Sequence, residues 1–189
     1  MQTVYLSEYQ VDWPKQFQGY KQKISQAFDE VLPLRIEHIG STSIIGMMAK
    51  PTIDIQVGVE QEGDLDKLIK PMQTLGFTYN STWNEAVPFR RFFQHLESEG
   101  RGMIPFEIDD SDKVDLRSRF VIKANIHCVP IDSEWWQRHL QFRDILRTNP
   151  KAFDLYLTTK KELAKKEWKV VSHYAEAKSR VIEEVMGMG

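Results

Sequence analysis

The sequence has few of the features that would place it outside an ordinary folded domain. Cys128 is its single cysteine, so no disulfide can form within the chain. The N-terminus has no basic start followed by an apolar stretch, so we expect no secretory signal and a reducing, cytoplasmic compartment. No apolar run approaches the roughly 18 residues of a membrane-spanning helix, so we expect no membrane partner. Charge of one sign is also scarce, because 25 basic residues face 27 acidic ones, and this balance argues against nucleic-acid binding.

The sequence does have enough apolar surface for one hydrophobic core. Hydrophobic residues make up 41% of the 189, and five Trp, six Tyr and ten Phe are among them. This is the composition of a globular protein rather than a disordered one. The length suits one domain of roughly 100–200 residues.

The order of helical and strand patterns predicts an α+β fold. A helix over 14–31 precedes short strands, a helix over 63–75 and a loop or hairpin insertion over 97–118. Beyond 132 only helical patterns remain. We therefore predict a mixed β-sheet core with flanking helices over 1–132, and a C-terminal helical bundle over 133–189 packed on it as one unit. The expected strands span 34–39, 52–59, 77–79, 89–96 and 120–129, and the expected C-terminal helices span 134–148, 150–166 and 168–186.

Polar side chains recur on one face of two of these strands. In the 52–59 strand, Asp54 and Gln56 alternate with isoleucine and valine, and in the 120–129 strand Asn125 and His127 alternate with apolar residues. If both strands turn their polar faces to the same side of one sheet, the four side chains converge. A solvent-facing aspartate and a locally bonded histidine are the ordinary alternatives for Asp54 and His127. Cys128 lies on the apolar face, as a small core residue does.

Several residues could bind an anion near that polar face. Gly40, Ser41, Thr42 and Ser43 form a turn between a strand and a short helix, where backbone N–H groups and hydroxyls can hold a phosphate, although such strings are also common caps. Further candidates are Lys50 just before the Asp54 strand, the basic-aromatic run Arg90, Arg91, Phe92 and Phe93, and the helix lysines Lys160 and Lys178. The two helix lysines lie in line with apolar positions, so each either extends to water or points into a cleft.

The segment IEHIGSTSIIGMMAKPTIDIQVGV, residues 36–59, resembles the signature of the GrpB family, an uncharacterised group regarded as predicted nucleotidyltransferases. The resemblance extends over nearly the whole chain, and the 97–118 stretch reads as an insertion relative to the family. Its other matching positions are Trp13-Pro14, Arg91-Phe92-Phe93, Ile126-His127-Cys128-Val129, Phe142-Arg143-Asp144, and Tyr174 with Lys178.

The resemblance implies a nucleotidyltransferase-like core and a particular site. Gly40 and Ser41 would match the turn that meets the nucleotide phosphates, and Asp54 the first of two strand carboxylates that hold divalent metal. The second carboxylate position is Gln56, a departure, and the later strand offers His127 and no acid. Glu37 would add an oxygen only if it, and not the alternating His38, faces Asp54. His127 would serve as a metal ligand or as a general base.

These observations leave three functional hypotheses. The first is a metal-dependent nucleotidyl- or phosphoryl-transferase for a small-molecule acceptor, with Asp54 and His127 catalytic, Asp54, Glu37 and His127 holding Mg²⁺ or Mn²⁺, and a nucleoside triphosphate as substrate. Its phosphate contacts would be Gly40, Ser41, Thr42, Ser43, Lys50, Arg91 and Lys178. The second, favoured by Gln56, is a catalytically inactive nucleotide- or phosphate-binding module. The third is a scaffold or interaction protein, with a homo-oligomer as one form, that uses the helix of Trp135 and Trp136 and exposes one of them; the alternative is that different neighbours bury both.

Overall fold

The computed structural model describes residues 4–28, 32, 34–100, 102–109, 119–168 and 171–189, and its centre is one six-stranded sheet. The order across the sheet is β1-β2-β6-β4-β3-β5. Neighbouring strands are antiparallel except for the parallel pairs β2–β6 and β3–β5. The strands are β1 (Arg35–Ile39), β2 (Ile53–Val59), β3 (Thr78–Asn80), β4 (Arg91–Ser98), β5 (Glu107–Ile108) and β6 (Phe120–Pro130).

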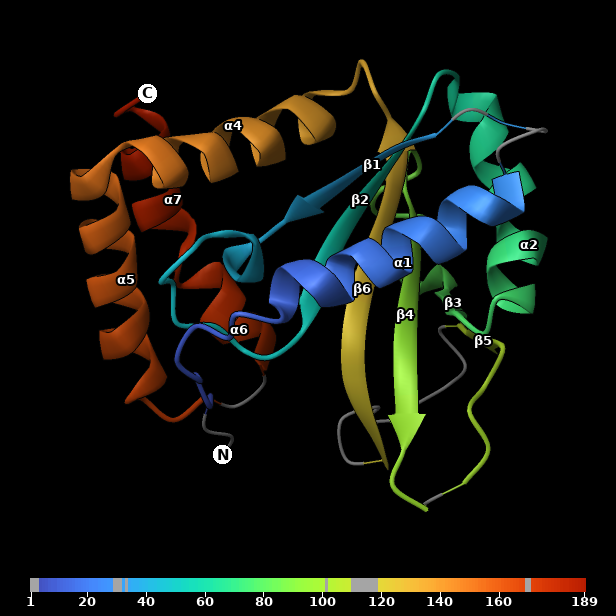
Figure 1. Ribbon diagram of the computed structural model, residues 1–189, viewed down its shortest axis with the longest axis horizontal. Coiled ribbons are helices and arrows are strands. Elements are labelled where there is room, and N and C mark those ends of the chain that lie inside the picture. Colours follow the sequence, from blue (N-terminus) through green and yellow to red (C-terminus); the bar gives the residue numbers. More distant parts are fainter. Residues whose placement is uncertain (1–3, 29–31, 33, 101, 110–118, 169–170) are drawn as a thin grey trace.

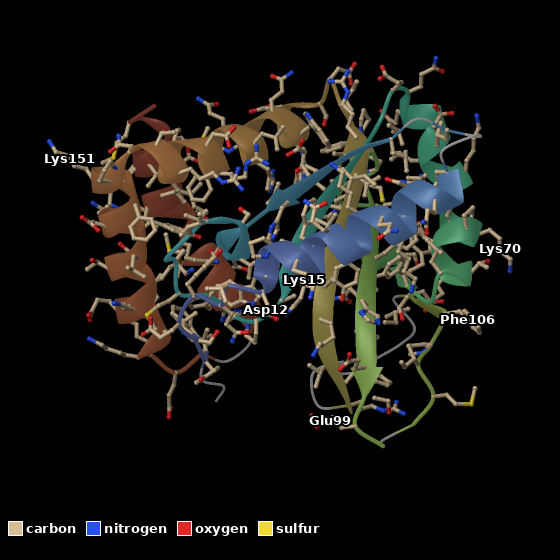
Figure 2. All side chains as sticks on the ribbon, in the orientation of Figure 1. Asp12, Lys15, Lys70, Glu99, Phe106 and Lys151 are labelled. Atoms are coloured by element: carbon tan, nitrogen blue, oxygen red, sulfur yellow. The ribbon has the colours of Figure 1, made fainter. Side chains whose placement is uncertain are left out.

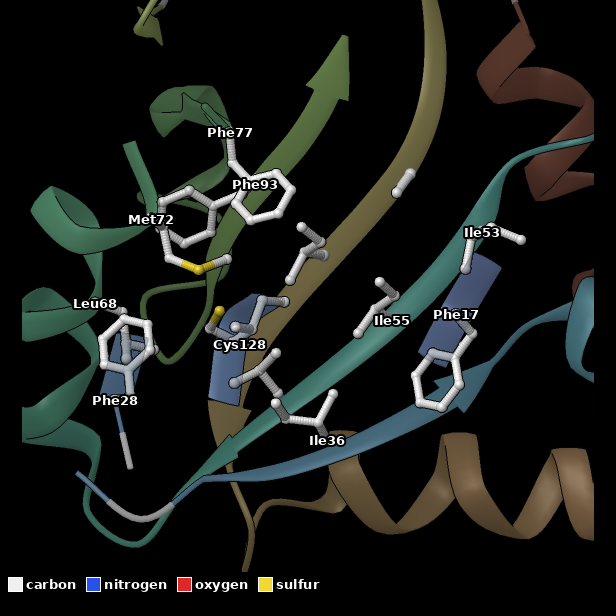
Figure 3. Close-up of a cluster of buried hydrophobic side chains, with 14 of the residues drawn as sticks. Phe17, Phe28, Ile36, Ile53, Ile55, Leu68, Met72, Phe77, Phe93 and Cys128 are labelled. Atoms are coloured by element: carbon white, nitrogen blue, oxygen red, sulfur yellow. The ribbon is translucent and has the colours of Figure 1, made fainter. Parts of the chain in front are cut away.

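Helices cover one face of this sheet and build the main core. Figure 1 shows α1 (Trp13–Phe28) lying across the middle strands, with α2 (Ile69–Thr74) beside it. The covered face carries the isoleucines and valines of β2 and the alternate apolar residues of β6, so the period-two pattern places them where α1 needs apolar partners. Cys128 lies among them (Figure 3), fully buried as predicted. The opposite face of β2 and β6 therefore carries their polar residues.

The C-terminal helices form a second, smaller core beside the edge strand β1 (Figure 1). They are α4 (Glu134–Thr148), α5 (Pro150–Ala164), α6 (Val171–Glu176) and α7 (Ser179–Met186). Asn149 ends α4 and caps α5, because its side-chain oxygen accepts from the backbone N–H groups of Lys151 and Ala152. Leu146, Tyr156 and Val185 pack together here with Met47 from the loop after β1. The loop between β1 and β2 thus lies between the sheet and the helices.

The predicted elements are confirmed with two differences. The expected helix over 63–75 is a 3₁₀ segment, η2 (Glu62–Leu68), that continues into α2. Pro71 has no N–H group and fits the first turn of a helix, so the α-helical part begins only at Ile69. The expected helix over 168–186 is broken at residues 177–178, and the two pieces bury different side chains, Tyr174 and Val181. Within the 97–118 stretch, β5 pairs with β3, and residues 101 and 110–118 lie outside the described residues.

Charged side chains lie at the rim of the molecule, where some large hydrophobic side chains such as Phe106 are exposed as well. Figure 2 shows Lys70, Glu99 and Lys151 at the rim of the molecule with their side chains directed away from the core. No helix in the described parts of the chain combines the length and the apolar character needed to cross a membrane.

Candidate functional site

The candidate site begins where β2 and β6 run side by side. The two strands are parallel, and their register sets Asp54 opposite Asn125 and Gln56 opposite His127. All four side chains therefore leave the sheet on the face that α1 does not cover. The Asn125 side-chain N–H donates to Asp54 Oδ1 at 3.0 Å, which fixes the carboxylate in place.

That hydrogen bond is the last of a chain that crosses four strands. Asn80 donates to Gln94 Oε1 at 3.4 Å, Gln94 donates to Asn125 Oδ1 at 3.1 Å, and Asn125 donates to Asp54. The Thr82 hydroxyl starts the chain by donating to Asn80 Oδ1 at 2.6 Å. We call these three amides the amide ladder. Because every donor points toward Asp54, the amide dipoles add and favour negative charge on the carboxylate.

Asp54 faces a cavity of about 460 Å³, which we call the Asp54 cavity. Ser41 and Thr42 line it from the turn after β1, and Asn125 lines it from the sheet. Its remaining polar lining comes from Thr52 and from Lys50, Lys160, Tyr174 and Lys178. The loop before β2, the C-terminal helical region and the strands β2 and β6 thus all contribute to a single cavity.

The three lysines give this cavity an excess of positive charge. Lys160 on α5 is 2% exposed and donates to the Met48 carbonyl at 2.5 Å. Burial, together with the neighbouring charge of Lys178, lowers the pKa of Lys160 to about 7, and Asp54 opposes the change. The ammonium groups of Lys50 and Lys178 each lie 4.9 Å from the centre of the Tyr174 ring. Three cationic side chains thus surround one carboxylate.

The buried surroundings of Asp54 and Tyr174 shift the pKa values of both side chains. Burial raises the pKa of Asp54, and the hydrogen bond from Asn125 and the three lysines oppose that rise. Tyr174 is 1% exposed, and its buried hydroxyl has no hydrogen-bond partner among the described residues. Burial also raises the pKa of Tyr174 to about 12, so the hydroxyl keeps its proton and remains a donor. The hydroxyl is enclosed, so the part of Tyr174 that the two ammonium groups approach is its aromatic ring.

Glycine is the one residue type that fits the first position of this turn, residue 40. Its φ is +67°, a left-handed conformation that favours glycine. A Cβ placed there would lie 2.9 Å from Asp54 Cβ and closer still to Asp54 Oδ2. The backbone of the turn therefore sits directly against the carboxylate, and Ser41 and Thr42 follow at the cavity wall.

Ser43 and Glu37 face a second cavity, of about 800 Å³, on the other side of this turn. Ser43 donates to the Gly40 carbonyl at 2.7 Å and so closes the turn. Glu37, and not His38, is on the Asp54 face of β1, but its carboxylate pairs with Arg143 at 2.7 Å. The predicted role of Glu37 as a metal ligand beside Asp54 is therefore wrong: α4 holds its carboxylate at the sheet edge.

Arg91 lies on the opposite face of the sheet. Its register partner is Cys128, a residue of the covered face, and its guanidinium pairs with Asp66 of η2 at 2.6 Å. The predicted phosphate contact through Arg91 is therefore wrong, because β4 turns Arg91 away from Asp54. Sequence alone could not decide this, since Arg90, Arg91 and Phe92 alternate and the register of β4 sets which of them faces Asp54.

His127 shares the face of Asp54 but does not line the Asp54 cavity. Its ring stacks on Phe92 at 4.8 Å and lies 6.1 Å from Trp135 of α4. Burial lowers the pKa of His127 to about 3, and the charges of Arg90 and His139 contribute. The ring is therefore neutral and enclosed. The two tryptophans of α4 are not an exposed pair either: Trp136 is buried, and Trp135 packs against His127 and His139.

The residues around Asp54 do not fit a resident divalent metal. Asp54 is the sole carboxylate in the lining of the cavity, and three lysines lie in that lining too. Across the described residues, no group of three or more His, Cys, Asp and Glu side chains is placed to hold a metal ion. Magnesium needs several oxygen ligands and calcium more, so one carboxylate bound by an amide is a poor donor set. The chemistry of the lining favours an anion.

Sequence reasoning missed the outer part of the amide ladder. Gln94 and Asn80 are ordinary polar residues in their strands, and only the order β2-β6-β4-β3 brings them into line with Asp54. The signal available in the sequence was weak: Gln94 follows Phe93, so the two side chains leave β4 on opposite faces, and only the register with β6 sets Gln94 beside Asn125.

Comparisons with known proteins agree with this fold. The family model described as GrpB protein matches residues 3–187. A UPF0157 protein of Halalkalibacterium halodurans is 31% identical over 184 residues, covering 97% of this chain and 81% of that protein. The glutamate-rich protein GrpB of Alkalihalophilus pseudofirmus is 28% identical over 184 residues, covering 97% and 94%. The crystal structure of conserved protein GrpB from Enterococcus faecalis matches with a TM-score of 0.70 at 27% identity, covering 97% of this chain and 98% of that one. Sequence, fold and the block over residues 36–59 agree: the chain belongs to the GrpB family, whose function is unknown.

Proposed function

We propose that the Asp54 cavity binds the phosphate groups of a small, nucleotide-like ligand. The observation that carries this proposal is the charge of the lining, in which Lys50, Lys160 and Lys178 surround the single carboxylate of Asp54. Ammonium groups are compact cations that bind phosphate oxygens well. A ligand with negative charge would offset the excess of positive charge.

The hydrogen-bonding groups and the size of the cavity favour a phosphate group over a simple halide. The Ser41 hydroxyl lies in the lining together with the lysines, so a neutral donor and charged donors are both present. The Thr42 hydroxyl is bonded to His38 at 3.0 Å, and the Thr52 hydroxyl donates to the Ile122 carbonyl at 3.1 Å. A phosphate has several oxygens that accept hydrogen bonds in different directions. The volume of about 460 Å³ is within the usual range for small-molecule sites.

Titration calorimetry tests this binding directly. We expect pyrophosphate and ATP to bind, adenosine to bind at least tenfold more weakly, and EDTA to leave pyrophosphate binding unchanged. Lys178→Met should weaken pyrophosphate binding about tenfold or more, because one charge-assisted contact is lost. Arg180→Met is the matched control, since Arg180 is exposed two residues further along the helix. Equal affinity for adenosine and ATP, or an equal loss in both variants, would reject the proposal.

A second candidate function is nucleotidyl or phosphoryl transfer at the same cavity. It is favoured by Gly40 and Ser41, which contact the Asp54 region as the turn of a nucleotidyltransferase-like site would. Burial raises the pKa of Asp54, which makes its carboxylate a better proton acceptor for an acceptor hydroxyl. The alternative is that the protein only binds its ligand.

Asp54→Asn separates these two functions. The asparagine can still accept the hydrogen bond from Asn125, so the fold should persist, while one negative charge leaves a cationic cavity. We expect pyrophosphate affinity to rise severalfold and any nucleotide turnover to fall by at least 100-fold. The assay follows release of pyrophosphate or phosphate from nucleoside triphosphates, with Mg²⁺, with Mn²⁺ and with EDTA. Turnover that Asp54→Asn leaves unchanged would exclude Asp54 from the chemistry.

A further inference from the structure

A second polar layer lies next to the Asp54 cavity and has no role in the function proposed above. It contains four buried side-chain atoms without hydrogen-bond partners: Gln56 Oε1, Arg90 Nε, His127 Nδ1 and Trp135 Nε1. Among the described residues, one further buried side-chain atom lacks a partner, the Tyr174 hydroxyl. Buried polar atoms are nearly always paired, so four unpaired atoms in one neighbourhood indicate that a polar partner belongs there. We call this group the Arg90 layer.

Strand register and α4 bring the four residues together. Gln56, His127 and Phe92 are opposed across β2, β6 and β4, so they form one row on the face that α1 leaves uncovered. The first turn of α4 lies over this row: the Gln56 side-chain N–H donates to the Trp136 carbonyl at 3.1 Å, and the Trp135 ring lies 6.1 Å from the His127 ring. The unpaired atoms are therefore enclosed between the sheet and α4.

Arg90 gives this layer its charge. Its side chain is 9% exposed, and its guanidinium carbon lies 4.9 Å from the centre of the Trp135 ring and 5.4 Å from that of Phe92. No ion pair within 4.0 Å joins it to an Asp or Glu of the described chain. Nearby His127 is neutral because burial lowers its pKa to about 3. A buried guanidinium without a carboxylate is costly unless an anion accompanies it.

We infer that the Arg90 layer binds a small anion, a halide or a single carboxylate group, between Arg90, Trp135 and the row of Gln56 and His127. Arg90 Nε–H and Trp135 Nε1–H are two donors that an anion would accept from, and a neutral imidazole can donate a third. Gln56 Oε1 is an acceptor, and a water that donates one proton to it and the other to the anion would complete the set. The enclosure by the sheet and α4 limits the ligand to a few atoms.

This site is distinct from the Asp54 cavity and does not depend on the function proposed for it. None of Gln56, Arg90, His127 and Trp135 lines that cavity. The Arg90 layer also accounts for two positions at which the sequence departs from a transferase-like pattern. Gln56 replaces a second carboxylate, which would repel an anion, and His127 is held neutral rather than exposed as a base.

Bromide diffraction on the unmodified protein is the first test. Crystals grown in sodium bromide should show an anomalous peak within hydrogen-bond distance of Arg90 Nε and Trp135 Nε1. Water alone at this position, with bromide found only on the surface, would overturn the inference.

Thermal unfolding at constant ionic strength is the second test. Replacing gluconate, which is too large for the layer, by chloride should raise the unfolding midpoint by a few degrees at saturation. Formate distinguishes a carboxylate site from a halide site, since it should reproduce the shift only if a carboxylate group fits. Arg90→Met should abolish the shift, and Trp135→Phe, which keeps an aromatic ring but removes the indole N–H, should reduce it. Arg91→Met is the matched control, because Arg91 lies on the opposite face with Asp66. A midpoint that neither anion moves, or an equal shift in the Arg90 and Arg91 variants, would contradict the assignment.

Discussion

Lys160→Met should weaken pyrophosphate binding by about 10–100-fold at pH 6, and its affinity should change between pH 6 and 9 only as the charge of pyrophosphate itself changes. Lys160 is enclosed in the lining of the Asp54 cavity, and burial lowers its pKa to about 7. The ammonium form is therefore full below pH 6 and is lost as the pH rises through 7. An anion bound by the charged form loses affinity over the same interval, well below the range in which an ordinary lysine deprotonates.

The lowered pKa of Lys160 also predicts a change in stability with pH, and its direction is opposite to that of the change in ligand affinity. In the unfolded chain a lysine holds its proton up to about pH 10.4, whereas in the folded protein Lys160 releases it near 7. Between these values the unfolded state binds more protons, so the stability of the ligand-free protein should rise with pH. Lys160→Met should lose this contribution.

Calorimetry from pH 6 to 9 and urea unfolding over the same range measure the two effects. Lys161→Met is the control, because Lys161 is the next residue of α5 and is exposed. It should change neither the pH profile of binding nor that of stability. A wild-type profile of affinity against pH that has the same shape as the Lys160→Met profile would mean that Lys160 does not contact the anion in its charged form.

Gly40→Ala should abolish measurable pyrophosphate binding and destabilise the protein by about 2–5 kcal/mol. The left-handed φ of +67° costs an alanine about 1–2 kcal/mol. The added Cβ also overlaps Asp54, whose position is fixed by Asn125, and overpacking of this kind typically costs about 1–3 kcal/mol more. Relief of the overlap must move the turn or the carboxylate, and either movement distorts the cavity.

Gly76→Ala separates the two causes. Gly76 also has a left-handed φ, +84°, but a Cβ there would meet nothing within 4 Å. Gly76→Ala should therefore lose stability from the backbone alone and retain ligand binding. Chemical denaturation gives both free energies of unfolding, and calorimetry gives the affinities. If Gly40→Ala binds pyrophosphate as the wild type does, the contact between the turn and Asp54 has no part in the site.

The arrangement of the fold follows largely from local patterns in the sequence. Alternation in β2 and β6 predicted which side chains face α1, and the polar residues Asp54 and Asn125 do share the other face. Local patterns do not contain strand order or register. Arg91 was therefore expected beside Asp54, although β4 places it against Asp66.

The cationic lining depends still more on tertiary structure. Lys160 and Lys178 were ambiguous in sequence, because a lysine in line with apolar positions either reaches water or enters a cleft. The break at residues 177–178 and the packing of α5 decide the matter by bringing both lysines to the cavity around Tyr174. No periodic pattern in the sequence indicates that a loop, a sheet and two helices contribute to one cavity.

The amide ladder has one further consequence, for the variation of sequence among related proteins. Each amide donates its N–H group toward Asp54, and its oxygen accepts a hydrogen bond from the preceding donor in the chain Thr82, Asn80, Gln94, Asn125. Reversing a single amide would therefore place two acceptors or two donors against each other. The orientation is all-or-none across the strands. Relatives in which the aspartate has been replaced by a cationic or apolar side chain should consequently have lost the matching asparagine and glutamine as well, a covariation that runs at right angles to the chain.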